Sequence, residues 1–225
     1  MIDIEKLYFT SDLHFDHESV DNEGNKRGIL IYCPARLTLG PTIQDMNRAL
    51  CELWNDTVPE DGVVLVLGDV GMSRRHLSVP YLQYCRGTKY LWPGNHDNCW
   101  APGRDGNQSK HFEKHCRDYM EWGQLAGIIQ PPTTLQLGEF EVTLSHMPDK
   151  EAGDQADHSE ELRFEHLRPP HDPNKWMFCG HVHQAWQLCE RRINVGVDVW
   201  NFAPVAATRL LSVMRKCENV WRNDR

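Results

Sequence analysis

The sequence lacks the features that mark several classes of protein. Its 8 cysteines form no Cys-x-x-Cys pair, so we expect no structural zinc site. The first six residues show no basic stretch followed by an apolar run, and so no secretory signal is visible. No apolar run approaches the roughly 20 residues that cross a membrane. We therefore expect a cytoplasmic protein with reduced thiols and no membrane partner.

Positive charge is also scarce in this chain. It has 24 Lys and Arg residues against 32 Asp and Glu residues, which gives a formal net charge of −8. Because binding to long nucleic acids depends on neutralising their phosphates, we expect no stable long nucleic-acid partner. A small phosphoester held by metal ions remains compatible with this charge, and the oligomeric state stays open.

The composition is that of an ordinary globular protein. The 225 residues are 40% apolar and 25% charged and show no internal repeat or linker, so we expect a single domain over residues 1–225. Strands and helices alternate early and hairpins follow, which predicts an α/β fold with an added β portion. Expected strands cover residues 7–11, 63–67, 88–92, 133–137, 140–144, 176–179, 185–188, 192–197 and 207–214, and expected helices begin near Thr42, Ser73 and Lys110.

Ionisable side chains gather directly after the expected strands. Asp69 follows Gly68 and the apolar run Val63–Leu67, which is typical of a strand buried on both faces. Taken alone, Asp69 could equally cap the following turn. A lone histidine at a strand end is likewise more often structural than a ligand. The full set at the strand ends is Asp12, His14, Asp69, Asn95, His96, Asp97, His146, His181 and His183.

In combination these residues predict a metal centre. A sheet that brings the strand ends together offers two Asp carboxylates, one Asn amide oxygen and at least four imidazoles, with no thiolate. One divalent cation needs only about four to six such ligands. Seven ligands fit two cations with Asp69 between them. Such pairs sit about 3.5–4 Å apart and clamp a phosphoryl group for in-line displacement.

Five sequence blocks resemble the calcineurin-like metallophosphoesterases, in that family's order and at compatible spacing. Similarity to the small bacterial and phage phosphoesterases of this superfamily covers most of the chain and is weak over residues 98–131 and 149–174. The resemblance implies an α/β fold of two packed mixed β-sheets flanked by helices. The blocks are Asp12-Leu13-His14, Gly68-Asp69, Gly94-Asn95-His96-Asp97, Ser145-His146 and Gly180-His181-Val182-His183.

The resemblance also implies a role for each residue of these blocks. A hydroxide between two divalent metals would attack phosphorus in line. His96 would act as a catalytic residue facing the leaving-group oxygen, and Asp97 would orient His96. We favour Mn²⁺, although Fe, Zn, Ni and Co also suit a set of nitrogen and oxygen ligands. Asp12, His14 and His183 would hold one metal, Asn95, His146 and His181 the other, and Asp69 would bridge them.

Substrate contacts are predicted from residues in or near these blocks. Asn95 and His17 could touch the phosphate, although a surface role suits His17 equally. Arg36 could bind the phosphate because a guanidinium matches its geometry, but a solvated loop arginine is as good an interpretation. Trp100, in the loop after the Asn-His-Asp block, could stack on a nucleobase.

We therefore expect a metal-dependent phosphoesterase that hydrolyses a small phosphodiester, with 2′,3′-cyclic nucleotides among the candidate substrates. A phosphomonoesterase or a nucleoside-polyphosphate hydrolase is one alternative, and a nuclease is another. A non-catalytic scaffold on the same fold is the least favoured, because such a protein should lack ligands and this chain has all seven.

Overall fold

The fold is described from a computed structural model of the chain. It describes residues 3–20, 23, 26–72, 74–103, 107–152 and 164–223. Within these ranges no helix is both long and apolar enough to cross a membrane. All 8 cysteines are free thiols.

The first sheet has five strands in the order β12-β1-β4-β5-β6. Neighbours from β1 to β6 pair in parallel, and β12 pairs antiparallel with β1. Parallel pairing brings the carboxyl ends of these strands, and the loops that follow them, to one edge of the sheet. The strands are β1 (Leu7–Thr10), β4 (Val63–Val66), β5 (Thr88–Leu91), β6 (Gly127–Ile128) and β12 (Val205–Ala206).

The second sheet also has five strands, in the order β10-β11-β9-β8-β7. Strand β9 pairs in parallel with both β8 and β11, whereas the β7–β8 and β10–β11 pairs are antiparallel, so this sheet is mixed as well. Its strands are β7 (Thr133–Leu137), β8 (Phe140–Leu144), β9 (Trp176–Cys179), β10 (Leu188–Cys189) and β11 (Arg192–Asn194).

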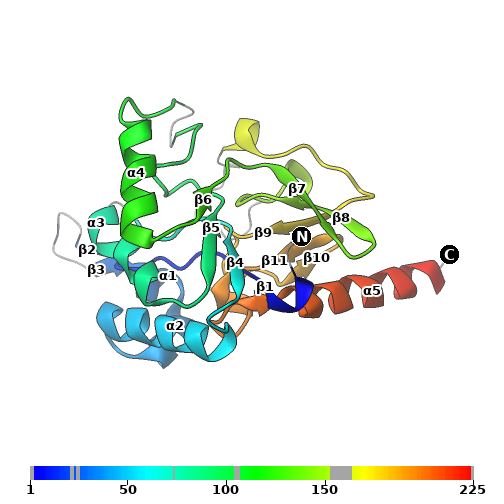
Figure 1. The fold of residues 1–225 in the computed structure, drawn as a ribbon, viewed down its shortest axis with the longest axis horizontal. Helices are drawn as coiled ribbons and strands as arrows, with labels where there is room; N and C mark the ends of the chain where they lie inside the picture. The colour runs from blue at the N-terminus through cyan, green and yellow to red at the C-terminus, as the bar shows by residue number, and fades with distance from the viewer. Residues whose placement is uncertain are drawn as a thin grey trace.

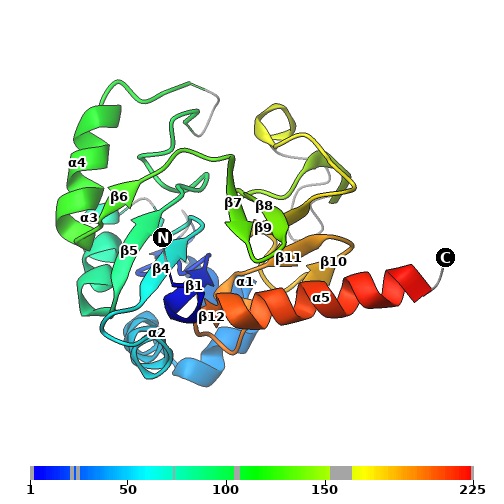
Figure 2. The same ribbon diagram turned by 45° about the vertical axis from the view of Figure 1, so that its right-hand side comes forward.

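The two sheets pack against each other through apolar side chains from both. Phe9 of β1 meets Phe178 of β9 edge to face, with ring centroids 5.0 Å apart. Leu65 of β4 and Val142 of β8 belong to the same buried cluster. The expected architecture of two packed mixed sheets flanked by helices is therefore confirmed (Figures 1 and 2).

Helices cover the other face of the first sheet. Met46 and Trp54 of α2 (Ile43–Thr57) and Tyr119 of α4 (Phe112–Gly123) share a second buried cluster with strand residues. The hydroxyl oxygen of Thr42 accepts a hydrogen bond from the Asp45 amide at 3.1 Å, so Thr42 begins α2 as its sequence predicts.

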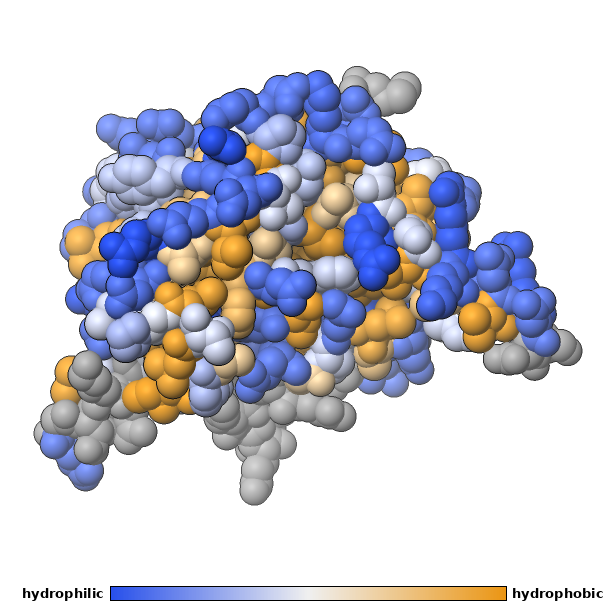
Figure 3. All heavy atoms as spheres, turned by 90° about the horizontal axis from the view of Figure 1, so that it is seen from below, coloured by the Kyte–Doolittle hydropathy of each residue, from blue (hydrophilic) through white to orange (hydrophobic). Residues whose placement is uncertain are grey.

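Helix α5 (Ala207–Asn223) corrects one prediction from the sequence. Residues 207–214 were expected to form a closing strand, but they begin this helix. The buried residues Ala207, Leu210, Leu211 and Met214 recur at helical spacing, a pattern that the strand interpretation overlooked. The far end of α5 projects from the body (Figure 2), and it carries mainly hydrophilic side chains at the right of Figure 3.

Two further elements differ from expectation, and several short ones were not foreseen. The helix expected to begin at Ser73, a residue outside the described ranges, is observed as α3 (Arg75–Ser78) followed by a 3-10 segment, because Pro80 cannot continue an α-helix. The strand expected at 185–188 begins only at Leu188. The unforeseen elements are the strands β2 (Glu18–Val20), β3 (Lys26–Gly28), β6 and β12, the helix α1 (Ile29–Tyr32) and the 3-10 segments Ile4–Lys6, Pro34–Leu39, Val79–Tyr84, Lys150–Ala152, Glu165–Leu167 and Val197–Val199.

Candidate metal centre

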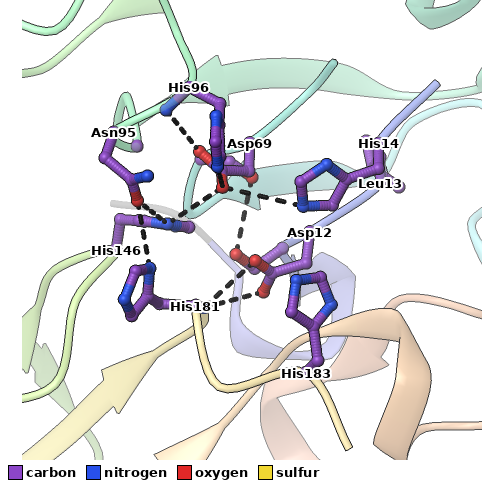
Figure 4. A network of polar contacts seen from close by, with 12 residues as sticks. Asp12, Leu13, His14, Asp69, Asn95, His96, His146, His181 and His183 are labelled. Carbon is purple, nitrogen blue, oxygen red and sulfur yellow. Dashed lines mark hydrogen bonds and ion pairs between the residues drawn. The ribbon is translucent and has the colours of Figure 1, made fainter. Parts of the chain in front are cut away.

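Loops from both sheets meet at one place in the molecule. After β1 and β4 the two loops are joined by backbone hydrogen bonds, from the Asp12 amide to the Gly68 carbonyl and from the His14 amide to the Asp69 carbonyl, each 3.0 Å long. The loops that follow β8 and β9 approach from the second sheet. Figure 4 shows the resulting group of side chains, which point toward one another across the junction of the sheets.

The backbone is strained at most of the predicted metal ligands. Five of the seven have positive φ angles, in the left-handed region that costs a residue with a side chain about 1–3 kcal/mol. Such strain persists only where the surrounding structure holds it, and it gathers at functional sites. The five φ angles are 57° at Asp12, 49° at His14, 53° at Asp69, 70° at His181 and 45° at His183.

Close backbone approach explains two of the glycines in the motifs. A Cβ on Gly68, whose φ is +89°, would lie 2.5 Å from the Gly94 amide nitrogen. A Cβ on Gly94 would lie 2.3 Å from Asp69 Oδ1. Only glycine at both positions lets the loops after β4 and β5 come together around Asp69.

The predicted ligands lie close enough together to bind the same cation. Asp12, His14 and His183 each offer a ligand atom within 4.8 Å of the others, and so do Asp12, Asp69 and His146. Asp69 is central, since its Oδ2 lies 3.6 Å from His14 Nε2 and 3.3 Å from His146 Nε2. The two trios share Asp12, so the carboxylates of Asp12 and Asp69 lie between the histidines (Figure 4).

Asn95 and His181 complete this group. Asn95 Oδ1 lies 3.1 Å from His146 Nε2 and 3.0 Å from His181 Nδ1. The His181 amide donates to both oxygens of Asp12, at 3.1 and 3.0 Å. The structure thus brings all seven predicted ligands together.

The residues present fit divalent cations. Both ring nitrogens of His14 are buried and have no hydrogen-bond partner within the described part of the chain. A buried polar atom without a partner is costly, and here a cation would satisfy it. Burial also lowers the pKa of His14 well below its usual range, which keeps the ring in the neutral form that binds metals.

Asp198 is a residue at this site that the sequence did not single out. Its carboxylate accepts a hydrogen bond from His183 Nδ1 at 2.9 Å and two from Arg36, at 2.7 and 2.8 Å. Burial alone would raise the pKa of Asp198, but the Arg36 guanidinium holds it well below its usual range. A carboxylate in this position orients a metal-binding imidazole.

Arg36 has a structural role in place of the predicted phosphate contact. Its side chain is fully buried, and besides Asp198 it donates to the carbonyls of Asp12 and Leu13 at 2.6 and 2.8 Å. The guanidinium therefore fixes the loop that carries Asp12 and His14, and it does not face an incoming phosphate.

Asp97 also differs from its predicted role of orienting His96. Its oxygens accept hydrogen bonds from the amides of Asp69 at 2.8 Å, Val70 at 3.2 Å and Gly94 at 2.9 Å. The Tyr119 hydroxyl of α4 donates the fourth, at 3.2 Å. Asp97 thus holds together the backbone of the two loops that carry Asp69 and Asn95.

The imidazole of His96 lies beside the predicted ligands. Its Nε2 is 3.9 Å from Asp69 Oδ2, and its ring centroid is 5.7 Å from that of His14. The His96 side chain remains 17% exposed, whereas that of Asp69 is 2% exposed. His96 is therefore more open to solvent than the carboxylate next to it.

His17 lies near the centre, and Trp100 does not offer the expected stacking face. The rings of His17 and His14 are 5.1 Å apart. Burial, followed by the nearby His96, lowers the pKa of His17 to about 4. Trp100 is only 4% exposed and packs edge to face on Phe164, so its ring is part of the protein interior.

Comparisons with known proteins found a matching family and several relatives. A family model described as calcineurin-like phosphoesterase matches residues 5–185. The Gene 66 protein of Mycobacterium phage D29 is 31% identical over 202 residues, covering 87% of this chain and 89% of its own. The uncharacterized protein MJ1445 of Methanocaldococcus jannaschii is 24% identical over 221 residues, covering 94% and 92%.

A solved structure shares the fold. The protein of unknown function AQ665 from Aquifex aeolicus matches with a TM-score of 0.57 and 17% identity, covering 92% of this chain and 98% of its own. At that identity the likeness concerns the fold alone. The matched family and the candidate metal cluster together support a metal-dependent phosphoester hydrolase. The chain belongs to the calcineurin-like phosphoesterase family, as the resemblance of its five blocks predicts.

Proposed function

We propose that this protein hydrolyses small phosphodiesters at a centre that holds two divalent cations. The observation that carries the proposal is the buried His14 ring, set among the carboxylates of Asp12 and Asp69, whose two nitrogens make no hydrogen bond to any described residue. A carboxylate and imidazole cluster of this kind suits cations that clamp a phosphoryl group. We also propose that residues 1–225 act as one domain, because the ligands come from loops of both sheets.

The assignment of ligands follows the geometry of the group. Two bound cations would stabilise charge on the phosphoryl oxygens and supply a nucleophile at neutral pH. The carboxylate of Asp69 lies between histidines on both sides, which suits a bridging position. We assign Asp12, His14 and His183 to one cation, Asn95, His146 and His181 to the other, and Asp69 to both. Mn²⁺ is the metal that we propose to test first.

His96 is the residue to which we assign proton transfer. Its partly exposed imidazole stands next to Asp69 and is more open to solvent than that carboxylate. From there it can donate a proton to the leaving-group oxygen or stabilise charge on the phosphoryl group. Asp97 positions the two loops that carry Asp69 and Asn95, because it accepts hydrogen bonds from the backbone of both.

A substrate screen with added Mn²⁺ tests this function. It compares bis(p-nitrophenyl) phosphate, p-nitrophenyl phosphate, 2′,3′- and 3′,5′-cyclic nucleotides and single-stranded DNA. We expect the diesters to be hydrolysed fastest, with cyclic nucleotides among them. A preference for the monoester would assign a phosphomonoesterase, and a preference for DNA a nuclease. Inactivity on every substrate with Mn, Fe, Zn, Ni and Co would favour the non-catalytic scaffold.

A further inference from the structure

A row of rings leads from the buried centre to the surface. The His183 and His14 rings lie 5.0 Å apart, those of His14 and His17 5.1 Å, and those of His17 and Tyr32 6.1 Å. From His14 outward the exposure rises, from 2% at His14 to 9% at His17 and 40% at Tyr32, while His183 at the other end of the row is 21% exposed. Tyr32 is thus an exposed aromatic side chain two rings away from a predicted metal ligand.

The position of Tyr32 is set by helix α1, which is anchored to the loop of His17. The Ile29 amide at the start of α1 donates to the His17 carbonyl at 3.1 Å. Gly28, just before it, has a φ of +143°, and a Cβ there would lie 2.3 Å from the same carbonyl oxygen. Glycine therefore allows α1 to lie directly against the His17 backbone.

The other end of α1 is tied to the metal centre as well. Cys33 follows Tyr32, and its amide closes the helical turn on the Ile29 carbonyl at 2.7 Å. The Cys33 sulfur lies within 4.8 Å of ligand atoms of His183 and Asp198. Tyr32 thus sits between two points of attachment, which limits how far its ring can move from the centre.

His17 adds a polar atom next to this aromatic surface. The His17 side chain is nine-tenths buried, and its Nδ1 has no hydrogen-bond partner among the described residues. An aromatic ring beside an unsatisfied polar atom suits a ligand that is planar and carries polar groups on its edge. A nucleobase has this chemistry, and every base can stack on an aromatic side chain because each has a π-face.

We propose that Tyr32 and His17 form the subsite for the organic half of the substrate, and that the substrate is a phosphoester of a nucleoside. This inference rests on the proposed function, because it places the phosphorus at the metal centre. Tyr32 stacks on the base, and His17 lies between the base and the phosphate. The subsite determines specificity and takes no part in the proton transfer assigned to His96.

Calorimetric titration of the Mn²⁺-loaded protein tests the subsite. The two ligands are adenosine 5′-monophosphate and ribose 5-phosphate, which differ only in the base. We expect the wild type to bind the nucleotide at least about 10-fold more tightly, as one base stacking on an aromatic ring allows. Tyr32→Ala should remove this preference by weakening nucleotide binding alone, whereas Tyr32→Phe should keep it.

Tyr84→Ala is the matched control, since Tyr84 is 70% exposed and its ring packs on Tyr81. It should leave both affinities unchanged. Equal affinities for the two ligands in the wild type, or equal losses for both in Tyr32→Ala, would overturn the subsite. Turnover assays separate this from the proposed function. A base preference that depends on Tyr32 without hydrolysis of any phosphoester would contradict the function and leave the subsite standing.

Discussion

The carboxylate of Asp198 connects His183 to Arg36. It accepts a hydrogen bond from His183 Nδ1 at 2.9 Å on one side and from Arg36 Nε at 2.7 Å on the other. Arg36 in turn donates to the carbonyl of Asp12, another predicted ligand, at 2.6 Å. Two predicted ligands that are far apart in the sequence, Asp12 and His183, are thereby held in one network.

Removing the charge of Asp198 should weaken metal binding. Asp198→Asn keeps the shape of the side chain but loses the anion that holds the His183 ring and Arg36, so we expect about 10–100-fold lower metal affinity. Calorimetry with Mn²⁺ measures the change. Glu139→Gln is the control, since Glu139 pairs with Arg215 at an exposed position, 2.8 Å away. Unchanged affinity in Asp198→Asn would show that the network does not orient the ligand.

Loss of the His96 imidazole should separate chemistry from metal binding. His96 is the partly exposed ring to which we assign proton transfer, and we assign it no cation. His96→Ala should keep both metals and lose roughly 10²–10⁴-fold in turnover. Metal analysis and steady-state kinetics on the same preparation provide the test. Near-normal turnover would remove His96 from the mechanism.

Asp69→Ala should weaken both cation sites together. The carboxylate of Asp69 lies 3.6 Å from His14 and 3.3 Å from His146, which we assign to different cations. In titration calorimetry the variant should therefore lose both binding events. If one event survives with its affinity intact, the bridging position is wrong.

Removal of metals should abolish activity and lower thermal stability. A cation that binds only the folded state stabilises it by about 2.7 kcal/mol at 100 times its dissociation constant. Extensive dialysis against a chelator should therefore lower the melting temperature, and added Mn²⁺ should restore both stability and activity. Full activity after chelation, with metal analysis showing an empty protein, would contradict the metal-dependent reaction.

Asp149 should contribute stability that depends on pH. Its oxygens accept hydrogen bonds from Arg192, each 2.9 Å long, and His171 Nδ1 lies 3.1 Å away. Burial alone would raise the pKa of Asp149, but Arg192 and His171 lower it overall. A lowered folded-state pKa means that the unfolded chain binds protons more readily. The stabilisation is therefore present above about pH 4 and is lost as the pH falls through the folded-state pKa.

Asp149→Asn should accordingly cost about 1–3 kcal/mol in the free energy of unfolding at pH 7, because it removes the buried one of the two carboxylates that pair with Arg192, the other being the exposed Glu190. Denaturant unfolding at pH 7 and near pH 3 should show this difference shrinking in acid. Glu141→Gln serves as the control, since its pair with Lys175 is exposed. A cost that stays constant over this pH range would show that the charge of Asp149 is not responsible.

Local patterns explain which parts of this protein were predictable. The β4 strand, the hairpin of the strands expected at 133–137 and 140–144, and the Thr42 cap of α2 each depend on neighbouring residues, and all three are observed. The same reasoning is wrong at α5, where a short apolar run predicts a strand but the buried residues repeat with helical spacing. An apolar run of that length is compatible with either element until its packing partner is known.

The sequence by itself predicts the seven ligands, because each follows a strand in a recognisable block. Only the tertiary structure decided how the surrounding residues are used. It paired Arg36 with Asp198, turned Asp97 toward backbone amides and placed Tyr32 beside His17. These contacts join residues far apart in the chain or depend on how α1 is anchored. They follow from packing and from the need to satisfy buried polar atoms, which no local pattern records.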